Sequence, residues 1–314
     1  MARYLLARLA VLALLTFAVS LLTFSMLSLA KGDPAEIILR SRMAGEQPSP
    51  AAVALLREEM GLNDSFPVRY AKWVGRAARG DLGYSFRTGR KVSADIADRF
   101  PRTAALAGAA ILVCILLAIP MGVISAARRG KSVDHLVVGG SIVLVSVPQF
   151  WLGTMLVLFF ALRLGLFPVA GSERAIQYVL PALTLGLGIS ATTARLTRST
   201  MLEVLLEDYI RTARAKGLSE GAVFFKHALR NALVPIVTNL GMNFRYLLGG
   251  VVFVEMVFSF KGIGLLLLDG IMSRDFPVVQ GCVLLIVVLT VLLNLAVDLS
   301  YVIIDPRIRL AGTS

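Results

Sequence analysis

The sequence predicts an all-α polytopic membrane protein with six transmembrane helices and both termini in the cytoplasm. Three observations support this fold class: the apolar composition, the length of the apolar runs, and the placement of the basic residues. Hydrophobic residues make up 57% of the 314 residues, and the mean hydropathy is +0.77. A soluble domain with this composition would leave too much apolar surface in water, so the chain is predicted to lie in lipid.

Six apolar runs are each long enough to cross a hydrocarbon core, which takes about 20 residues in a helix. A span surrounded by lipid must satisfy its own backbone hydrogen bonds, and a helix does this within one segment. Five runs contain no charged residue, and the other contains only Arg245 near its middle and Glu255 near one end. The predicted spans cover residues 9–30, 103–127, 136–162, 175–194, about 233–258, and 276–297.

The net charge of the chain is +12, which by itself would be compatible with binding to nucleic acid. However, the basic residues gather in the short segments on one side of the predicted spans, and few lie in the short loops on the other side. Under the positive-inside rule this asymmetry places both termini in the cytoplasm, and long translocated segments do not enter the count. The charge therefore predicts a lipid bilayer, and not nucleic acid, as a partner.

Three regions follow from this topology. Residues 1–30 hold the N-terminal segment and the first span, whose uncharged run of 22 residues exceeds the apolar region of a cleaved signal peptide, about 7–15 residues. Residues 31–102 form an extracytoplasmic segment. Residues 103–314 form a core of five helices, with a cytoplasmic loop at about 195–234.

The extracytoplasmic segment is predicted to contain two short helices. Residues 50–60 follow a Ser-Pro start signal and end before Gly61, and residues 67–79 end before Gly80. The apolar face expected for the second helix consists of Val68, Ala71, Val74 and Ala78. The segment is either a solvated cap on the bundle or a docking surface for an external partner.

The cytoplasmic loop at about 195–234 is long, charged and helical in pattern, and Gly217 interrupts it. We expect Gly217 to take a positive φ angle, which other residues adopt only at a cost of roughly 1 kcal/mol or more. Val223, Phe224 and Phe225 then place an apolar group in a basic loop, which predicts that a partner surface covers them. The alternative is an amphipathic helix that lies on the lipid interface.

The chain shows no pattern typical of catalysis. Residues 125–132 end like a phosphate-binding loop, but the first glycine is absent and the segment follows a predicted span instead of a strand. His135 and His227 are the only histidines, and both fall on the cytoplasmic side. Cys114 and Cys282 lie inside predicted spans, so no metal-ligand spacing or disulfide framework is present. The chain is predicted to be neither an enzyme nor a metal protein.

Several segments, in order along nearly the whole chain, together carry a family resemblance. The cytoplasmic loop contains Glu207-Asp-Tyr-Ile-Arg-Thr-Ala-Arg-Ala-Lys-Gly217-Leu and His227-Ala-Leu-Arg-Asn-Ala-Leu-Val-Pro235. The other segments are Gly32-Asp-Pro34, Gly80-Asp-Leu-Gly83, Ser146-Val-Pro-Gln-Phe-Trp-Leu-Gly153, Val254-Glu-Met-Val-Phe-Ser259, Gly262-Ile-Gly264, Asp275-Phe-Pro-Val-Val-Gln280 and Asp305-Pro-Arg-Ile-Arg309. In this order they resemble the permease subunits of binding-protein-dependent ABC importers, specifically the dipeptide/oligopeptide/nickel branch. The loop resembles the EAA loop of that family.

The loop departs from the general EAA pattern in a way that is usual for this branch. Arg211 and Thr212 stand where Glu and Ala are common, whereas Ala213 and Gly217 are kept. Two other departures concern the outer gate and the pore. Lys261 stands where the branch commonly has proline, and Arg245 stands where it commonly has a small residue.

The resemblance implies a type I ABC importer permease fold in the bacterial inner membrane and a heterodimer with a second homologous permease. It also implies two cytoplasmic ATPase subunits, which would bind ATP and Mg, and an extracytoplasmic solute-binding protein. This chain would carry no cofactor, and its cargo would be a dipeptide, an oligopeptide or a nickel chelate moved by alternating access. The part after Gly217 would be the coupling helix, seated in a groove of one ATPase. The implied coupling residues are Arg211, Thr212, Ala213, Gly217, Val223, Phe224 and Phe225.

Five polar residues in the predicted spans are candidates for the pore or a gate: Arg245, Asn239, Asn243, Gln149 and Glu255. Arg245 lies near mid-membrane, where a charge costs at least about 2.5–3.5 kcal/mol, so it either lines the pore or pairs with the second permease. Asn239, Asn243 and Tyr246 share roughly one helical face, which is consistent with a wet or protein-facing side. Gln149 follows a proline that is predicted to kink the third span, and Glu255 is either a gate residue or an outer-interface residue.

Two other classes of function remain open at the level of the sequence. A membrane scaffold without a transport cycle would need no ATPase partner. A secondary transporter is a third possibility, although the spans show no inverted repeat.

Overall fold

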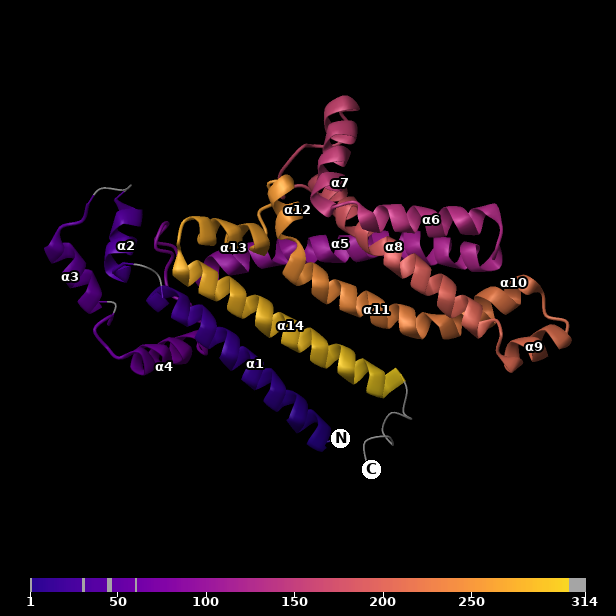
Figure 1. Cartoon of the computed structure of the whole chain (residues 1–314), viewed down its shortest axis with the longest axis horizontal. Coiled ribbons are helices and arrows are strands. Elements are labelled where there is room, and N and C mark those ends of the chain that lie inside the picture. Colours follow the sequence, from indigo (N-terminus) through magenta and orange to yellow (C-terminus); the bar gives the residue numbers. More distant parts are fainter. Residues whose placement is uncertain (1, 30–31, 44–46, 60, 305–314) are drawn as a thin grey trace. The chain divides into compact units, whose positions relative to one another are not determined.

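The computed structural model of the chain describes residues 2–29, 32–43, 47–59 and 61–304. Within these ranges every regular element is a helix (Figure 1), and an isolated antiparallel bridge joins Tyr84 to Lys91. The all-α class predicted from the sequence is confirmed.

The chain divides into two compact units, and each is described by itself. Unit 1 comprises residues 1–102 and 261–292, and unit 2 comprises residues 103–260 and 293–314. The elements with residues in unit 1 are α1 (Ala2–Leu29), α2 (Pro34–Arg42), α3 (Pro50–Glu59), α4 (Phe66–Ala77), α5 (Val92–Ala127, first part), α13 (Ile263–Met272) and α14 (Phe276–Ile304, first part). The elements of unit 2 are the rest of α5, α6 (Ser132–Ser146), α7 (Gln149–Leu156), η1 (Val157–Arg163), η2 (Ala175–Tyr178), α8 (Val179–Val204), α9 (Asp208–Ala215), α10 (Glu220–Ala222), η3 (Val223–Ala228), α11 (Leu229–Gly250), α12 (Val252–Val257) and the end of α14.

Three described helices are long and apolar enough to cross a membrane: Val92–Ala127, Ala175–Val204 and Phe276–Ala296. A fourth span results if the bent pair Ser132–Ser146 and Gln149–Arg163 is counted as one. The apolar helix Ala10–Met26 is shorter, and the run predicted at about 233–258 is divided between α11 and α12. The chain is therefore an integral membrane protein with three to four candidate spans among its described residues.

The third predicted span is broken at the residue that the sequence singled out. Pro148 separates α6 from α7 in an extended conformation with φ −60° and ψ 135°, and the axes of the two segments differ by 101°. A proline lacks the N–H that would continue a helix, which explains the break. The kink predicted at this position is confirmed, and Gln149 is the first residue of α7.

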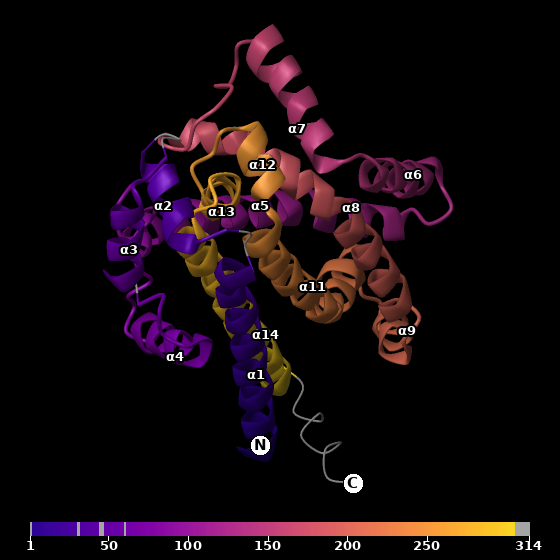
Figure 2. The ribbon, with the colours of Figure 1, turned by 60° about the vertical axis from the view of Figure 1, so that its left-hand side comes forward.

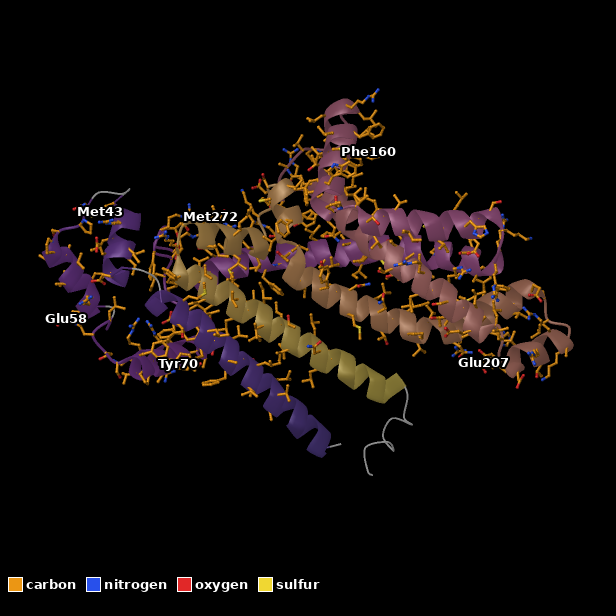
Figure 3. All side chains as sticks on the ribbon, in the orientation of Figure 1. Met43, Glu58, Tyr70, Phe160, Glu207 and Met272 are labelled. Atoms are coloured by element: carbon orange, nitrogen blue, oxygen red, sulfur yellow. The ribbon has the colours of Figure 1, made fainter. Side chains whose placement is uncertain are left out.

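Helices α3 and α4 lie where the sequence predicted two short helices, whereas α2 was not predicted. The buried face of α4 was predicted wrongly. Val68 and Val74 of the expected apolar face are 44% and 38% exposed, whereas Trp73 is only 6% exposed. The rings of Tyr70 and Trp73 each lie 5.5 Å from the ring of Phe24 in α1, measured between centroids, and Figure 3 labels Tyr70 on α4. Aromatic rings bury more area than Val or Ala, so they determine which face packs.

A buried carboxylate in unit 1, that of Asp275, is hydrogen-bonded to a turn that lies far from it in the sequence. Asp275 is 2% exposed. It accepts hydrogen bonds from the Ser85 hydroxyl at 2.5 Å, the Phe86 N–H at 3.0 Å and the Arg87 N–H at 3.3 Å. A carboxylate bound by three donors is well compensated for its burial. The turn after Gly83 and the segment that begins at Asp275 are therefore one structural feature.

Unit 2 is organised around α5 and α8, which approach each other through glycines. A Cβ atom on Gly122 of α5 would lie 2.5 Å from Cβ of Thr197 and 2.7 Å from the carbonyl oxygen of Ala194. A Cβ atom on Gly186 of α8 would lie 2.6 Å from Cβ of Val113 in α5. Small residues at such crossings let membrane helices pack backbone to backbone. Two close contacts thus fix α8 against α5 along its length.

Candidate functional site

The cytoplasmic loop predicted at about 195–234 is helical over most of its length. It contains the end of α8, then α9, a turn, α10 and η3, and it continues into α11 (Figures 1 and 2). Glu207, labelled in Figure 3, precedes α9 as its N-cap residue in an extended conformation with φ −66° and ψ 147°. We refer to residues 205–228 as the coupling loop.

Gly217 forms the turn of the coupling loop, as predicted. Its φ is +76°, and its N–H donates to the carbonyl oxygen of Arg214 at 2.9 Å. The Arg214 guanidinium also reaches across the turn to Glu220, with Nε–Oε1 at 2.9 Å and Nη2–Oε2 at 3.3 Å. A planar guanidinium bound to a carboxylate at two points defines the geometry of both partners. The turn is therefore closed by its own side chains, and Arg214 belongs to the loop itself.

The inner side of the coupling loop packs on the ends of the long helices. Ile210 and Val223 are fully buried, and Ala213 is 6% exposed. They belong to one hydrophobic cluster with Val123 of α5 and Met201 of α8. The loop is thus a packed part of unit 2, so a force on it would be transmitted to α5 and α8.

The expectation that Val223, Phe224 and Phe225 form one exposed apolar group is wrong for Val223. Val223 is buried in the cluster, Phe224 is half-buried and packs against it, and Phe225 is 65% exposed. Residues 223–228 form a π-helix, a rare element that is frequent at functional sites. Its turn directs neighbouring side chains to opposite sides, so Phe225 remains available to a partner.

Three further apolar residues of the coupling loop are exposed. Leu206 is 66%, Tyr209 is 41% and Leu218 is 40% exposed. The sequence analysis missed them because it considered only the run Val223–Phe225 as the apolar group of the loop. The helical period of α9 could have identified Tyr209, because the buried Ile210 and Ala213 lie three residues apart on the opposite side. The large exposed apolar residues of the coupling loop are therefore Leu206, Tyr209, Leu218 and Phe225.

The remaining coupling candidates lie on α9. Arg211 is exposed and pairs with Asp208 at 3.4 Å, and the Thr212 hydroxyl donates to the carbonyl oxygen of Asp208 at 3.0 Å. Exposed ion pairs within one helix contribute little to stability, about 0.3–0.5 kcal/mol. Arg211 is thus able to change partner at small cost.

Two of the pore candidates are brought together between α8 and α11. Asn243 Nδ2 donates to Asn239 Oδ1 at 3.0 Å and to the Thr193 hydroxyl at 3.3 Å, and the Thr193 hydroxyl lies 3.1 Å from Asn239 Oδ1. Asn239 and Asn243 are half-buried, whereas Thr193 is fully buried. The pair therefore bonds α11 to α8 while part of each amide remains accessible.

The other pore candidates do not join this network. The Gln149 amide lies over Gly188 of α8, where a Cβ atom would come within 2.6 Å of its nitrogen. Glu255 is completely buried and accepts a hydrogen bond from the Thr103 hydroxyl at 2.8 Å, so within unit 2 it packs between α12 and α5. Arg245 lies on α11, and its side chain is outside the described residues.

Two family descriptions, both of binding-protein-dependent transport systems, match successive parts of the chain. Residues 118–310 match the family described as binding-protein-dependent transport system inner membrane component. Residues 1–107 match the N-terminal region of the same transport system membrane components. The chain belongs to this family.

Individual relatives narrow this family assignment. It is 42% identical over 299 residues to a probable peptide ABC transporter permease protein of Sinorhizobium fredii, covering 93% of this chain and 94% of that protein. It is 40% identical over 309 residues to a glutathione transport system permease protein of Salmonella paratyphi A, covering 98% and 99%. It is an ABC importer permease of the peptide/oligopeptide family, a transporter subunit and not an enzyme.

A solved structure supports the fold of this permease. The crystal structure of an amino acid ABC transporter with histidines matches with a TM-score of 0.50 and 15% identity. The match covers 66% of this chain and 92% of that one. At this identity the likeness concerns the fold alone, and it agrees with a helical permease.

Proposed function

We propose that this permease forms one half of a translocation pathway for peptides in the bacterial inner membrane. It would span the bilayer six times with both termini in the cytoplasm. A second homologous permease would complete the pathway, two cytoplasmic ATPase subunits would bind ATP and Mg, and a solute-binding protein would deliver the cargo from outside. The family supports ATPase and substrate-binding partners in general, and the residues support the individual roles below.

The observation that carries this proposal is the two-sided construction of the coupling loop. Its inner side is buried with α5 and α8 around Ile210 and Val223, and its outer side exposes Tyr209 and Phe225. Exposed apolar side chains in a water-facing loop favour a protein partner, and large aromatic anchors contribute most to such interfaces. We assign this partner as one ATPase subunit.

Alternating access would then follow from a rigid connection. When the ATPase subunits close on ATP, the groove that holds Phe225 would move, and the buried side of the loop would displace α8 and α11. Packed helices respond as bodies that shift between discrete arrangements. The bonded pair Asn239 and Asn243 lies on the interface that such a shift would change, so we assign these amides to the pathway wall.

The proposed cargo is a dipeptide or oligopeptide. The two relatives described above are named for peptide and for glutathione transport, and glutathione is itself a small peptide. The alternative cargo is a nickel chelate, in which the chelator and not the permease supplies the metal ligands. Competition for uptake by unlabelled dipeptides, glutathione and a nickel chelate distinguishes these cargoes.

Unit 1 offers a surface for the solute-binding protein. A cavity of about 810 Å³ is lined by aromatic and basic residues, including Phe24, Trp73 and Phe86, and its wall from α4 and the following turn carries Arg69, Lys72, Arg76 and Arg79. Only Asp64 and Asp81 in the lining oppose this charge. Complementary charge steers a partner and sets its register. We therefore assign this face to an acidic surface of the binding protein and leave the solvated cap as the alternative.

Site-specific crosslinking tests the assignment of the coupling loop. Cysteines replace Leu218, Gly221 and Phe225 one at a time in the assembled complex, with a cysteine at the exposed Tyr84 of unit 1 as the control. Crosslinks from the loop to an ATPase subunit, and none from Tyr84, are expected. Crosslinks from the loop to lipid alone would show an interfacial helix and would contradict the proposal. Uptake without any ATPase subunit would favour a secondary transporter, and an assembled complex without uptake would favour a scaffold.

A further inference from the structure

One buried carboxylate of unit 2 lies outside the coupling loop and the polar face of α11. Asp134, in the first turn of α6, is 3% exposed. It accepts hydrogen bonds from the Ser125 hydroxyl of α5 and from the Gly130 N–H at 2.9 Å. Arg198 of α8 binds both carboxylate oxygens, with Nε–Oδ1 at 2.6 Å and Nη2–Oδ2 at 2.8 Å. Each oxygen thus has two donors from two different segments.

This arrangement specifies geometry more than an ordinary ion pair does. A guanidinium and a carboxylate joined at two points must be coplanar, and the Asp134 side chain is only 4% exposed, so water does not compete for it. A fully satisfied polar network in a packed site stabilises one arrangement of its neighbours. We call Ser125, Gly130, Asp134 and Arg198 the clamp.

The clamp lies where α5, α6 and α8 meet at one end of the bundle. Ser125 is one turn beyond Gly122, the glycine that Thr197 approaches most closely, and Arg198 follows Thr197 directly. The clamp and the glycine contact therefore act on the same crossing of α5 and α8. The turn between α5 and α6 is closed by Gly130, whose φ is +74°, so α6 is held to the same crossing.

The clamp is also next to the coupling loop. Arg198 lies six residues before the end of α8 at Val204, which is about 9 Å along a helix. Val123 and Met201 flank the clamp in sequence, and both belong to the hydrophobic cluster that buries the inner side of the loop. The clamp thus connects the cluster beneath the loop to the spans.

We propose that Asp134 is a positioning residue for transport, because the clamp makes the ends of α5, α6 and α8 move together when the coupling loop is displaced. This inference rests on the proposed function. In the intact chain the displacement passes through the buried cluster to α5 and α8, and through the clamp to α6. Without the clamp, α8 slides or turns against α6. Displacement of the coupling loop then moves α8 without α6, and the other helices of the pathway keep their positions. ATP hydrolysis then continues while transport fails.

The test uses Asp134→Asn and Arg198→Lys in the full complex reconstituted with its ATPase subunits and the binding protein. Asp134→Asn keeps the shape but removes the charge, and Arg198→Lys keeps the charge but removes the two-point contact. Peptide uptake and phosphate release are measured in the same proteoliposomes. We expect uptake per ATP hydrolysed to fall at least about ten-fold in both variants, with phosphate release retained.

The matched control is Asp98→Asn on α5. Its carboxylate pairs with Arg102 at 3.1 Å but is 54% exposed, so it constrains no neighbouring helix. Its uptake per ATP is expected to equal that of the wild-type complex. An unchanged ratio in Asp134→Asn, or a loss of uptake in proportion to the amount of assembled complex, would overturn the proposal. Failure of both clamp variants to assemble would likewise show a role in folding instead of positioning.

A distance measurement separates the clamp from the proposed function. Spin labels at Leu136 of α6 and Ser199 of α8, both exposed, report the separation of the two helices. A narrow distribution in the wild-type complex and a broad one in Asp134→Asn are expected, and equal widths would contradict the clamp. If the wild-type complex moves no peptide, the proposed function fails, whereas the distance distributions still test whether the clamp holds α6 to α8.

Discussion

Val223 and Phe225 are two positions apart in one short π-helix, yet one is fully buried and the other is 65% exposed. Their roles differ accordingly. Val223 joins the cluster with Ile210 and Met201, so it holds the coupling loop to the spans. Phe225 contributes nothing to that cluster and is suited to a partner. Single substitutions are thus able to separate stability of the loop from docking.

Phe225→Ala is expected to weaken binding of the ATPase subunit without unfolding the permease. Truncation of an aromatic anchor costs about 2 kcal/mol, or roughly thirty-fold in Kd. Val223→Ala is the contrasting variant, because loss of a buried side chain lowers stability by about 1–3 kcal/mol. Affinity for the isolated ATPase and the thermal midpoint of the purified permease measure the two effects. A normal Kd for Phe225→Ala would remove this residue from the interface.

Gly217→Val is expected to abolish uptake. A β-branched residue at φ +76° is strained by at least about 1 kcal/mol and changes the turn that Arg214 and Glu220 close. Gly221→Ala is the matched control, since this helical glycine has a normal φ and open space around its Cβ position. Uptake in proteoliposomes decides the comparison. Equal uptake in the two variants would mean that the conformation of the turn is unimportant.

At the scale of elements, the function proposed here depends on how closely α5 and α8 are joined. Gly122 and Gly186 let the two backbones approach, and the clamp around Asp134 adds α6. Helices α6 and α7 are not joined in this way, because Pro148 interrupts the helix and their axes differ by 101°. The coupling loop therefore packs against α5 and α8, and Asp134 bonds α6 to both of these helices. Helix α7 does not continue the axis of α6.

Gly122→Ala is expected to destabilise unit 2 by about 1–3 kcal/mol, because the new methyl group would overlap Thr197 and the Ala194 backbone. Gly108→Ala on the same helix meets no atom within 4 Å. It should leave the thermal midpoint of the purified complex nearly unchanged. A similar midpoint for the two variants would contradict the close crossing of α5 and α8.

At the scale of the whole molecule, the proposal gives the translocation pathway to this chain and the nucleotide sites to its partners. The segment that ends like a phosphate-binding loop is closed internally, because the Ser125 hydroxyl and the Gly130 N–H already bind the Asp134 carboxylate. A phosphate would have to displace that anion. We therefore expect ATP to bind to the ATPase subunits and not to this segment.

The purified chain alone is expected to release no phosphate from ATP, and addition of the ATPase subunits should restore hydrolysis. Phosphate release at matched protein concentrations measures this. An ATPase subunit with its own catalytic residue inactivated serves as the control for contamination. Turnover by the chain alone would contradict the assignment as a transporter subunit without a nucleotide site.

The sequence by itself determined the class of protein and the position of its main breaks. Long uncharged runs have no stable alternative to helices in lipid, and Pro148 and Gly217 carry backbone restrictions that act locally. For the same reason the φ of Gly217 and the kink before α7 were predicted correctly. The ordered motifs also identified the family, which the relatives confirm.

Only the tertiary structure decided which side chains act together. Two features that it decided are contacts between residues far apart in the sequence: the hydrogen bond from Thr103 to Glu255 and the ion pair of Asp134 with Arg198. Two others are cases in which buried and exposed residues share one apolar pattern: Val223 in the coupling loop and the aromatic face of α4. Periodicity reports that a residue is apolar and on a given face, but not which neighbouring element covers that face. Such pairings depend on packing between helices, and the order of residues along one helix does not encode them.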